Sequence, residues 1–145
     1  MKLCVLGGGS TYTPELMDGL IKKRDKIFFD EVYLMDINEE NLKVVSNFIR
    51  RMFKKHGLET KVVDTTDAEE AIEESDFVVT QIRVGGIRGR IIDEKVPLKY
   101  GVIGQETTGP GGFAFALRAI PVLVDYARKV AKLAPNSWLI NFSNP

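Results

Sequence analysis

The sequence predicts an α/β fold in which a mainly parallel, doubly wound sheet carries helices on both faces. Short apolar runs, typical of strands buried on both sides, alternate along the chain with segments whose apolar residues recur at helical spacing. The first apolar run ends in three glycines, Gly7 to Gly9, directly before a segment with helical spacing. Right-handed crossovers between successive strands would make the sheet parallel.

Local signals justify each element. Thr13 is expected to cap the first helix, with Pro14 at its first helical position, and Asn38 to cap the second helix, which Gly57 ends. Glycines interrupt every regular pattern over residues 83–112, so we expect an irregular, functional segment there. The expected strands cover residues 2–6, 31–37, 60–63, 77–82 and 138–142, and the expected helices lie between Thr13 and Ile21, between Asn38 and Gly57, and over 68–74 and 113–133.

Composition and charge exclude several classes of protein. Lys and Arg together number 20, as do Asp and Glu, so no bulk charge favours binding to nucleic acid or to a membrane surface. Cys4 has no partner for an internal disulfide, and the lone histidine, His56, cannot build a metal cluster. No run approaches the roughly 18 apolar residues that a membrane span needs. We therefore expect a cytoplasmic protein.

The glycine run is typical of a turn that binds a dinucleotide. Between a strand and a helix, such a turn brings backbone N–H groups against a pyrophosphate and directs the helix N-terminus at its charge. Gly7 and Gly9 occupy the first two places of the G-x-G-x-x-G pattern, whereas Tyr12 occupies the third. An ordinary strand-to-helix turn is the alternative, but the position in the chain favours a Rossmann-like, dinucleotide-binding domain.

An acidic residue closes the second expected strand. Asp36 can accept hydrogen bonds from the ribose of adenosine and would repel a 2′-phosphate, so NAD is favoured over NADP. The alternative is that Asp36 caps the next helix. In combination with the glycines, the ribose role is favoured.

Three arginines follow the fourth expected strand, at the edge of an open sheet where substrates reach a cofactor. Arg83, Arg88 and Arg90 lie among glycines, and guanidinium groups bind phosphate or carboxylate in a bidentate manner. The alternative is a solvated basic loop paired with Asp93 and Glu94.

The stretch QETTGPGG, residues 105–112, is dense in hydrogen-bonding side chains and glycines, which predicts a substrate loop; the alternative is a loop that leads into the next helix. Together, VLGGGSTYTPEL, IRVGGIRGRIIDEKVPLKYGVIGQETTGPGGFAFALRAIP and NFSNP closely resemble glycoside hydrolase family 4, and within it the 6-phospho-β-glucosidases. The resemblance covers the whole chain. It implies that residues 1–145 are an NAD-binding, Rossmann-like domain that ends before the family's C-terminal catalytic and metal-binding region.

The resemblance implies a glycosidase that depends on NAD and Mn²⁺ and acts on phosphorylated disaccharides or aryl glucosides. In the family's reaction NAD oxidises the sugar at C3, a tyrosine removes the C2 proton, the group at C1 is eliminated, water adds and the ketone is reduced again. A divalent metal stabilises the charge that develops on the sugar oxygens. The resemblance also implies a homo-oligomer.

Matched position by position, the resemblance assigns roles to seven residues. These roles are pyrophosphate binding for Gly7, Gly9 and Ser10, ribose binding for Asp36, phosphosugar binding for Arg90 and Asn144, and, for Glu106, support of the basicity of the catalytic tyrosine. The family's tyrosine and its metal-binding cysteine and histidine lie outside these 145 residues. The chain alone is therefore expected to bind the cofactor and to lack glycosidase activity.

Two other functions stay open on the residues alone. NAD-dependent 2-hydroxy-acid dehydrogenases share the fold logic and also place arginines in a loop after the fourth strand. A non-catalytic nucleotide-binding module would need little beyond the glycine turn and Asp36. The QETTGPGG stretch argues against the dehydrogenase.

Overall fold

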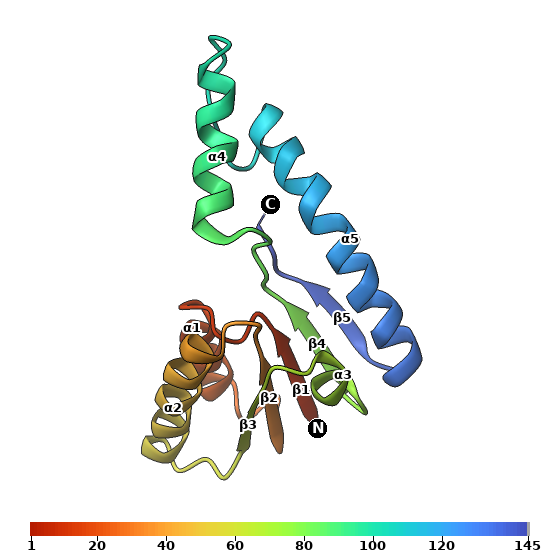
Figure 1. The fold of residues 1–145 in the computed structure, drawn as a ribbon. Coiled ribbons are helices and arrows are strands. Elements are labelled where there is room, and N and C mark those ends of the chain that lie inside the picture. The colour runs from red at the N-terminus through yellow and green to blue at the C-terminus, as the bar shows by residue number, and fades with distance from the viewer. Residues whose placement is uncertain (145) are drawn as a thin grey trace. The chain divides into compact units, whose positions relative to one another are not determined.

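The computed structural model describes residues 1–144, which divide into two compact units. The first unit contains residues 1–81 and 129–142, and the second contains residues 82–128 with Ser143 and Asn144. The elements, in chain order, are β1 (Lys2–Leu6), α1 (Thr13–Lys22), β2 (Glu31–Met35), α2 (Glu39–Lys55), β3 (Lys61–Thr65), α3 (Ala68–Ile72), β4 (Phe77–Thr80), α4 (Gly86–Leu98), α5 (Gly109–Leu133) and β5 (Trp138–Asn141) (Figure 1).

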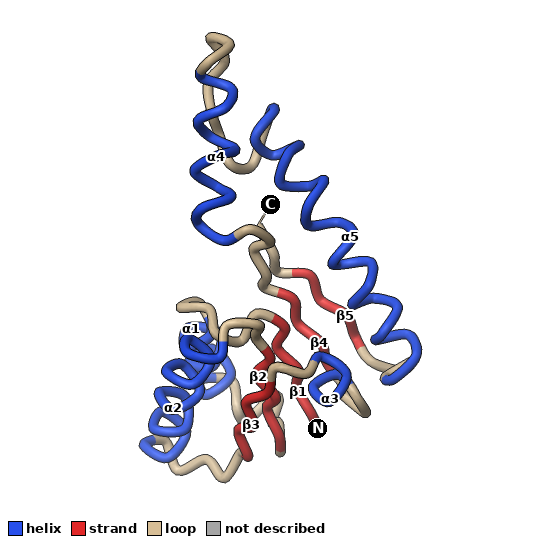
Figure 2. Tube along the Cα trace, viewed as in Figure 1, coloured by secondary structure: helices blue, strands red, loops and turns tan. Residues whose placement is uncertain are grey.

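The first unit is built on a five-stranded parallel sheet in the order β3-β2-β1-β4-β5 (Figure 2). Leu6, at the end of β1, pairs with Met35 on one side and with Thr80 on the other, so three strands end at one edge of the sheet. The chain order reverses between β1 and β4, and such a switch point is where open α/β sheets bind ligands. The predicted Rossmann-like fold is confirmed.

Helices cover both faces of this sheet. Leu3 and Val5 of β1 belong to one apolar cluster with Met17 of α1 and Ile49 of α2, whereas α3 packs on the opposite face of β1 and β2 (Figure 1). Successive strand residues point to opposite faces, so β1 is buried on both. Each fully buried aliphatic side chain contributes about 1.5–3 kcal/mol of transfer free energy, which makes this strand the centre of the core.

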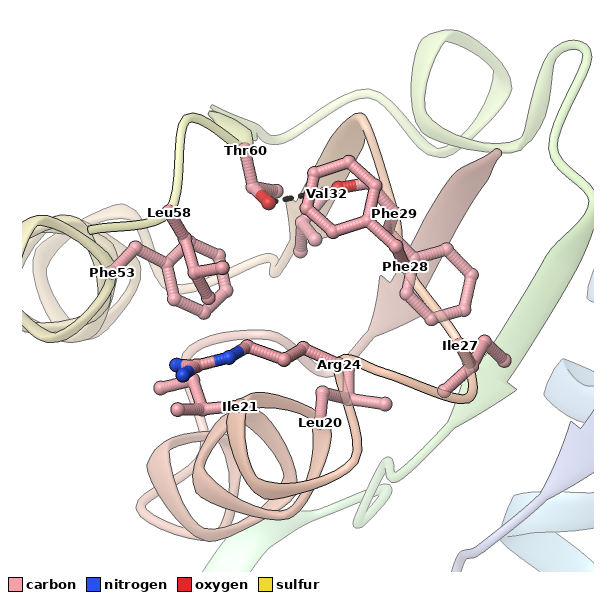
Figure 3. A pocket seen from close by; sticks show the side chains of 10 residues that line it. All are labelled: Leu20, Ile21, Arg24, Ile27, Phe28, Phe29, Val32, Phe53, Leu58 and Thr60. Atoms are coloured by element: carbon pink, nitrogen blue, oxygen red, sulfur yellow. Dashed lines mark hydrogen bonds between the residues drawn. The ribbon is translucent and has the colours of Figure 1, made fainter. Parts of the chain in front are cut away.

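A small apolar hollow lies at the amino ends of the strands, away from the end of β1 where the glycines follow. Phe53, Leu58 and Val32 line it, and Arg24 extends beside them (Figure 3). Thr60 Oγ1 donates a hydrogen bond of 2.8 Å to the carbonyl oxygen of Phe29 at its rim. This bond ties the segment before β3 to the segment before β2.

Most of the predicted strands end within two residues of the observed bounds. Asn38 caps α2 as predicted, because its Oδ1 accepts the N–H of Asn41 at 3.0 Å. The prediction for Thr13 was wrong: Tyr12 is the N-cap of α1, and Thr13 is a buried first helical residue. Its hydroxyl donates to the carbonyl oxygen of Gly8 at 3.0 Å, so it faces the glycine turn instead of capping the helix.

The predicted irregular segment over residues 83–112 was also wrong, because it contains α4 and the first turn of α5. Helical spacing is hard to detect in α4 because its isoleucines, Ile87, Ile91 and Ile92, are all exposed and form no buried stripe. Residues of this helix form ion pairs, among them Arg90 with Glu94 and Asp93 with Arg118.

Candidate functional site

The glycine turn folds back on the end of β2. Gly7 and Gly8 both donate their N–H groups to the carbonyl oxygen of Met35, at 2.9 and 2.7 Å, and Ser10 donates to the carbonyl oxygen of Gly7 at 3.1 Å. Gly7 has a φ of +92°, a backbone conformation that favours glycine. The sequence motif therefore forms a tight, internally bonded turn at the switch point of the sheet.

Two of the glycines are required by close contacts. A Cβ at Gly8 would lie 2.8 Å from Leu34 Cβ and 2.9 Å from Leu34 Cα, and a Cβ at Gly9 would lie 2.9 Å from Asp36 Oδ2. Gly8 holds the variable place of the G-x-G-x-x-G pattern, so the pattern gave it no role. The run of three consecutive glycines was the signal for it.

Asp36 is fixed beside this turn. Its Oδ2 accepts the N–H of Gly9 at 3.0 Å, and its Oδ1 accepts the N–H of Asn38 at 2.9 Å. Asn38, and not Asp36, supplies the side-chain cap of α2. Each carboxylate oxygen has a second lone pair, so Asp36 can still accept hydrogen bonds from a ligand hydroxyl.

The turn retains donors for an anionic ligand. From Gly7 to Thr13, Thr11 is the residue whose N–H has no protein acceptor among the described residues. Ser10 Oγ accepts the N–H of Tyr12 at 3.2 Å, which leaves its hydroxyl hydrogen available. Both residues directly precede α1, whose N-terminus carries partial positive charge. These donors, the close-packed Gly8 and the carboxylate of Asp36 fit a dinucleotide.

A second candidate site, the anion cluster, consists of Arg83, Arg90, Glu94 and Glu106 in the second unit. Glu106 Oε2 lies 2.9 Å from Arg90 Nε and 3.2 Å from Arg83 Nη2. Arg90 Nε also donates to Glu94 Oε1 at 2.7 Å, one helical turn along α4. Arg88 is exposed and forms no ion pair among residues 1–144, so it does not join this cluster.

Within the anion cluster, Arg90 keeps donor nitrogens that no protein group uses among the described residues. Two guanidinium nitrogens lie within ion-pair distance of Glu106 Oε2, yet no N–H among the described residues is directed at this buried oxygen. The hydrogen bond to Glu94, helped by the charge of Glu106, raises the pKa of Arg90 and keeps it cationic. Within the described part of the chain, Arg90 donates through Nε, so its two terminal nitrogens remain for a bidentate anion.

Asn144 contacts the same cluster with its backbone carbonyl group. Its carbonyl oxygen accepts a hydrogen bond of 3.1 Å from Arg83 Nη2, and the neighbouring Ser143 Oγ accepts the N–H of Ile82 at 3.2 Å. The structure thus brings together Arg83, Arg90, Glu106 and Asn144, which come from separate parts of the sequence.

An ion pair between a half-buried arginine and a buried aspartate supports the helix that carries Arg90. Arg118 of α5 donates through Nη1 and Nη2 to the two carboxylate oxygens of Asp93 on α4, at 2.9 and 2.5 Å, and Asp93 is 5% exposed. A Cβ at Gly85 or Gly89 would come within 3.2 Å of the guanidinium of Arg118. Sequence reasoning missed Arg118, which had no signal beyond its place in a helical pattern.

Among residues 1–144, no group of three or more His, Cys, Asp or Glu side chains is placed to hold a metal ion. No helix among these residues is both long and apolar enough to cross a membrane.

Residues 2–145 match the family model described as family 4 glycosyl hydrolase. The chain belongs to this family. It is 48% identical over 147 residues to a probable 6-phospho-beta-glucosidase from Bacillus subtilis (strain 168), in a match that covers 100% of the chain and 33% of that relative. The chain thus spans about a third of the length of the curated relatives it matches.

Solved structures of family 4 enzymes have the same fold. A 6-phospho-beta glucosidase from Thermotoga maritima with manganese, NAD⁺ and glucose-6-phosphate has a TM-score of 0.93 and 46% identity, covering 100% of this chain and 35% of its own. A 6-phospho-alpha-glucosidase from gut microorganisms in complex with NAD and glucose-6-phosphate has a TM-score of 0.95 and 36% identity, covering 100% and 34%. The family likeness therefore includes relatives of both anomeric specificities.

Proposed function

We propose that the protein containing this chain hydrolyses 6-phospho-β-glucosides with the help of NAD and Mn²⁺, and that residues 1–145 carry the cofactor-binding part. The observation that carries the proposal is the position of Arg90 in a chain of family 4. Its Nε lies at ion-pair distance from Glu94 and Glu106. Its terminal nitrogens are available to the 6-phosphate of a sugar.

The glycine turn would bind the pyrophosphate of NAD. Gly7 and Gly9 would shape the turn, because their N–H groups are used within the protein, while Ser10 and Thr11 would donate hydrogen bonds to the anion. Asp36 would accept hydrogen bonds from the adenosine ribose. When bound, NAD supplies a hydride acceptor for the sugar.

The anion cluster would bind the substrate. Arg90 would bind the phosphate, and Asn144 would contact the phosphosugar from the segment that Arg83 holds at its backbone carbonyl. Glu106 would lie beside the reacting sugar and support the basicity of a tyrosine outside this chain.

The metal ligands would be the cysteine and histidine that the family resemblance places outside the 145 residues. We assign no role to a metal at any residue of this chain. For the same reason we expect residues 1–145 alone to bind NAD without hydrolysing a glycoside.

The β anomer is proposed on the 48% and 46% identity to two 6-phospho-β-glucosidase relatives. A third β relative is 42% identical, and two phospho-α-glucosidase relatives are 43% and 39% identical, so the two groups overlap. The anomer is therefore decided by a direct comparison of the two substrates.

The proposal is tested with the full-length protein and p-nitrophenyl β-glucoside 6-phosphate, with and without NAD and Mn²⁺. The non-phosphorylated glucoside and the α anomer serve as matched controls. We expect hydrolysis that requires both cofactors and the 6-phosphate and is faster for the β anomer. Hydrolysis without NAD, or equal rates for the non-phosphorylated glucoside, would contradict the proposal.

A further inference from the structure

Gln81 directly follows β4 and joins the switch point of the sheet to the glycine turn. Its backbone N–H donates to the carbonyl oxygen of Leu6 at 2.9 Å, so it continues the pairing of β4 with β1. Its side-chain Nε2 donates to the carbonyl oxygen of Gly7 at 3.1 Å and to Thr13 Oγ1 at 2.5 Å. One amide thus contacts both ends of the turn that precedes α1.

The neighbours of Gln81 fix which way its amide points. The carbonyl oxygen of Gly7 can only accept a hydrogen bond, and Thr13 already uses its hydroxyl hydrogen to donate to Gly8 at 3.0 Å. The nitrogen of the amide must therefore face both groups, and Oε1 must face away. This oxygen is buried and has no donor among the described residues.

The stability of the protein does not explain this arrangement. The carbonyl oxygen of Gly7 also accepts the N–H of Ser10 at 3.1 Å, and the hydroxyl of Thr13 keeps its bond to Gly8. Neither group would be left without a partner if the amide of Gln81 were absent. An apolar side chain of the same length would also remove a buried acceptor that has no donor, which is unfavourable in a folded protein.

A buried polar group without a partner calls for an explanation, and a functional role is one such explanation. The demand here concerns the turn, because Ser10 and Thr11, which offer donors to an anion, lie between the two groups that Gln81 holds. We propose that Gln81 is a positioning residue for the dinucleotide, which fixes Gly7 and Thr13 and thereby sets the place of the donors between them. This inference rests on the proposed binding of NAD.

The test is NAD binding by the full-length protein, measured by isothermal titration calorimetry, together with its thermal unfolding. Gln81→Met keeps the length of the side chain and removes the amide. We expect it to weaken NAD binding about tenfold, as two hydrogen bonds that order the turn are lost. We expect the Tm to stay at or above the wild-type value, because a buried acceptor without a donor is removed.

Thr60→Val is the matched control. It removes a side-chain bond to a backbone carbonyl, that of Phe29, at the amino ends of the same sheet. We expect this variant to lower the Tm and to leave the affinity for NAD unchanged. The two variants should therefore show opposite patterns.

Unchanged affinity in Gln81→Met would overturn the inference, as would a loss of affinity that follows a matching loss of Tm. If Gln81→Met does not fold, Thr13 decides the question: Thr13→Ser, which keeps the hydroxyl, should bind NAD normally, and Thr13→Val should bind it weakly. Equal affinities of these two variants would overturn the inference. Wild-type protein that binds no NAD would instead remove the proposed function and the inference with it.

Discussion

Arg90 and Glu106 meet with Nε and Oε2 2.9 Å apart, although one lies on α4 and the other in the loop before α5. The same carboxylate oxygen is buried and lies 3.2 Å from Arg83 Nη2, so it is within ion-pair distance of two guanidinium groups. Without Glu106 the two cations would repel each other. The carboxylate therefore allows Arg83 and Arg90 to lie close together.

Replacement of Arg90 tests the phosphate role. Arg90→Ala in the full-length protein should raise the KM for the 6-phosphorylated substrate about ten- to a hundredfold, since a charge-assisted, bidentate contact is lost. Arg88→Ala is the matched control, because Arg88 lies on the same helix, is exposed and forms no ion pair among the described residues. Steady-state kinetics decide, and equal KM values for the two variants would exclude a phosphate role for Arg90.

Glu106→Gln keeps the shape of the side chain and removes its charge. If Glu106 supports a catalytic base, kcat should fall about a hundredfold, within the range of general acid–base effects. The affinity for NAD should not change. A change in KM with kcat intact would show that Glu106 serves the arginines and not the reaction.

The Asp93–Arg118 pair should contribute to stability because the carboxylate of Asp93 is buried and needs a cationic partner. Arg118→Met leaves the buried carboxylate of Asp93 without its partner, and we expect the free energy of unfolding to fall by about 3 kcal/mol. Lys22→Met removes an exposed ion pair with Asp18 and should leave the urea midpoint unchanged.

The double variant Asp93→Leu with Arg118→Met tests whether the loss of stability comes from leaving the Asp93 carboxylate buried without a partner. It should be more stable than Arg118→Met alone, because no buried charge then lacks a partner. A double variant that is less stable than the single variant would contradict this account.

Gly9 and Gly19 differ in how much space surrounds them, so replacing each with alanine tests different effects. Gly9→Ala places a Cβ 2.9 Å from Asp36 Oδ2, so we expect loss of NAD binding as the turn and the carboxylate move apart. Gly19→Ala lies in α1 with open space around it and should stabilise the protein by about 0.5–1 kcal/mol with normal NAD binding. Calorimetric titration and urea unfolding measure both effects, and normal binding by Gly9→Ala would show that the turn tolerates a Cβ.

Cys4 links stability to alkaline pH. Burial raises the pKa of its thiol from 9.0 to about 12. Between these values the unfolded chain releases the thiol proton while the folded protein keeps it, so stability falls as pH rises above 9. At pH 10 the loss should be about 1 kcal/mol relative to a Cys4→Ala variant, whose pH profile lacks this contribution. Parallel profiles of the two proteins between pH 8 and pH 10 would contradict this prediction.

Local patterns in the sequence were enough to predict the sheet and the glycine turn of the candidate site. Buried strands such as Lys2–Leu6 give continuous apolar runs, and Asn38 caps its helix with its own side chain, so both can be read from neighbouring residues. The glycine turn is similarly local. Thr13 was misassigned because its hydroxyl bonds to Gly8 and Gln81, and the contact with Gln81 depends on how β4 lies beside β1.

The sequence by itself determined the alternation of strands and helices, the glycine turn and the family, because these depend on residues that are neighbours in the chain. The pairing of Arg90 with Glu94 was offered by the sequence, but tertiary structure alone decided the pairs between distant residues. Arg118 reaches Asp93, and Arg90 reaches Glu106, because α5 and the loop before it lie beside α4 in the second unit. Helix α4 was not predicted because its isoleucines are exposed and leave no periodic apolar pattern in the sequence.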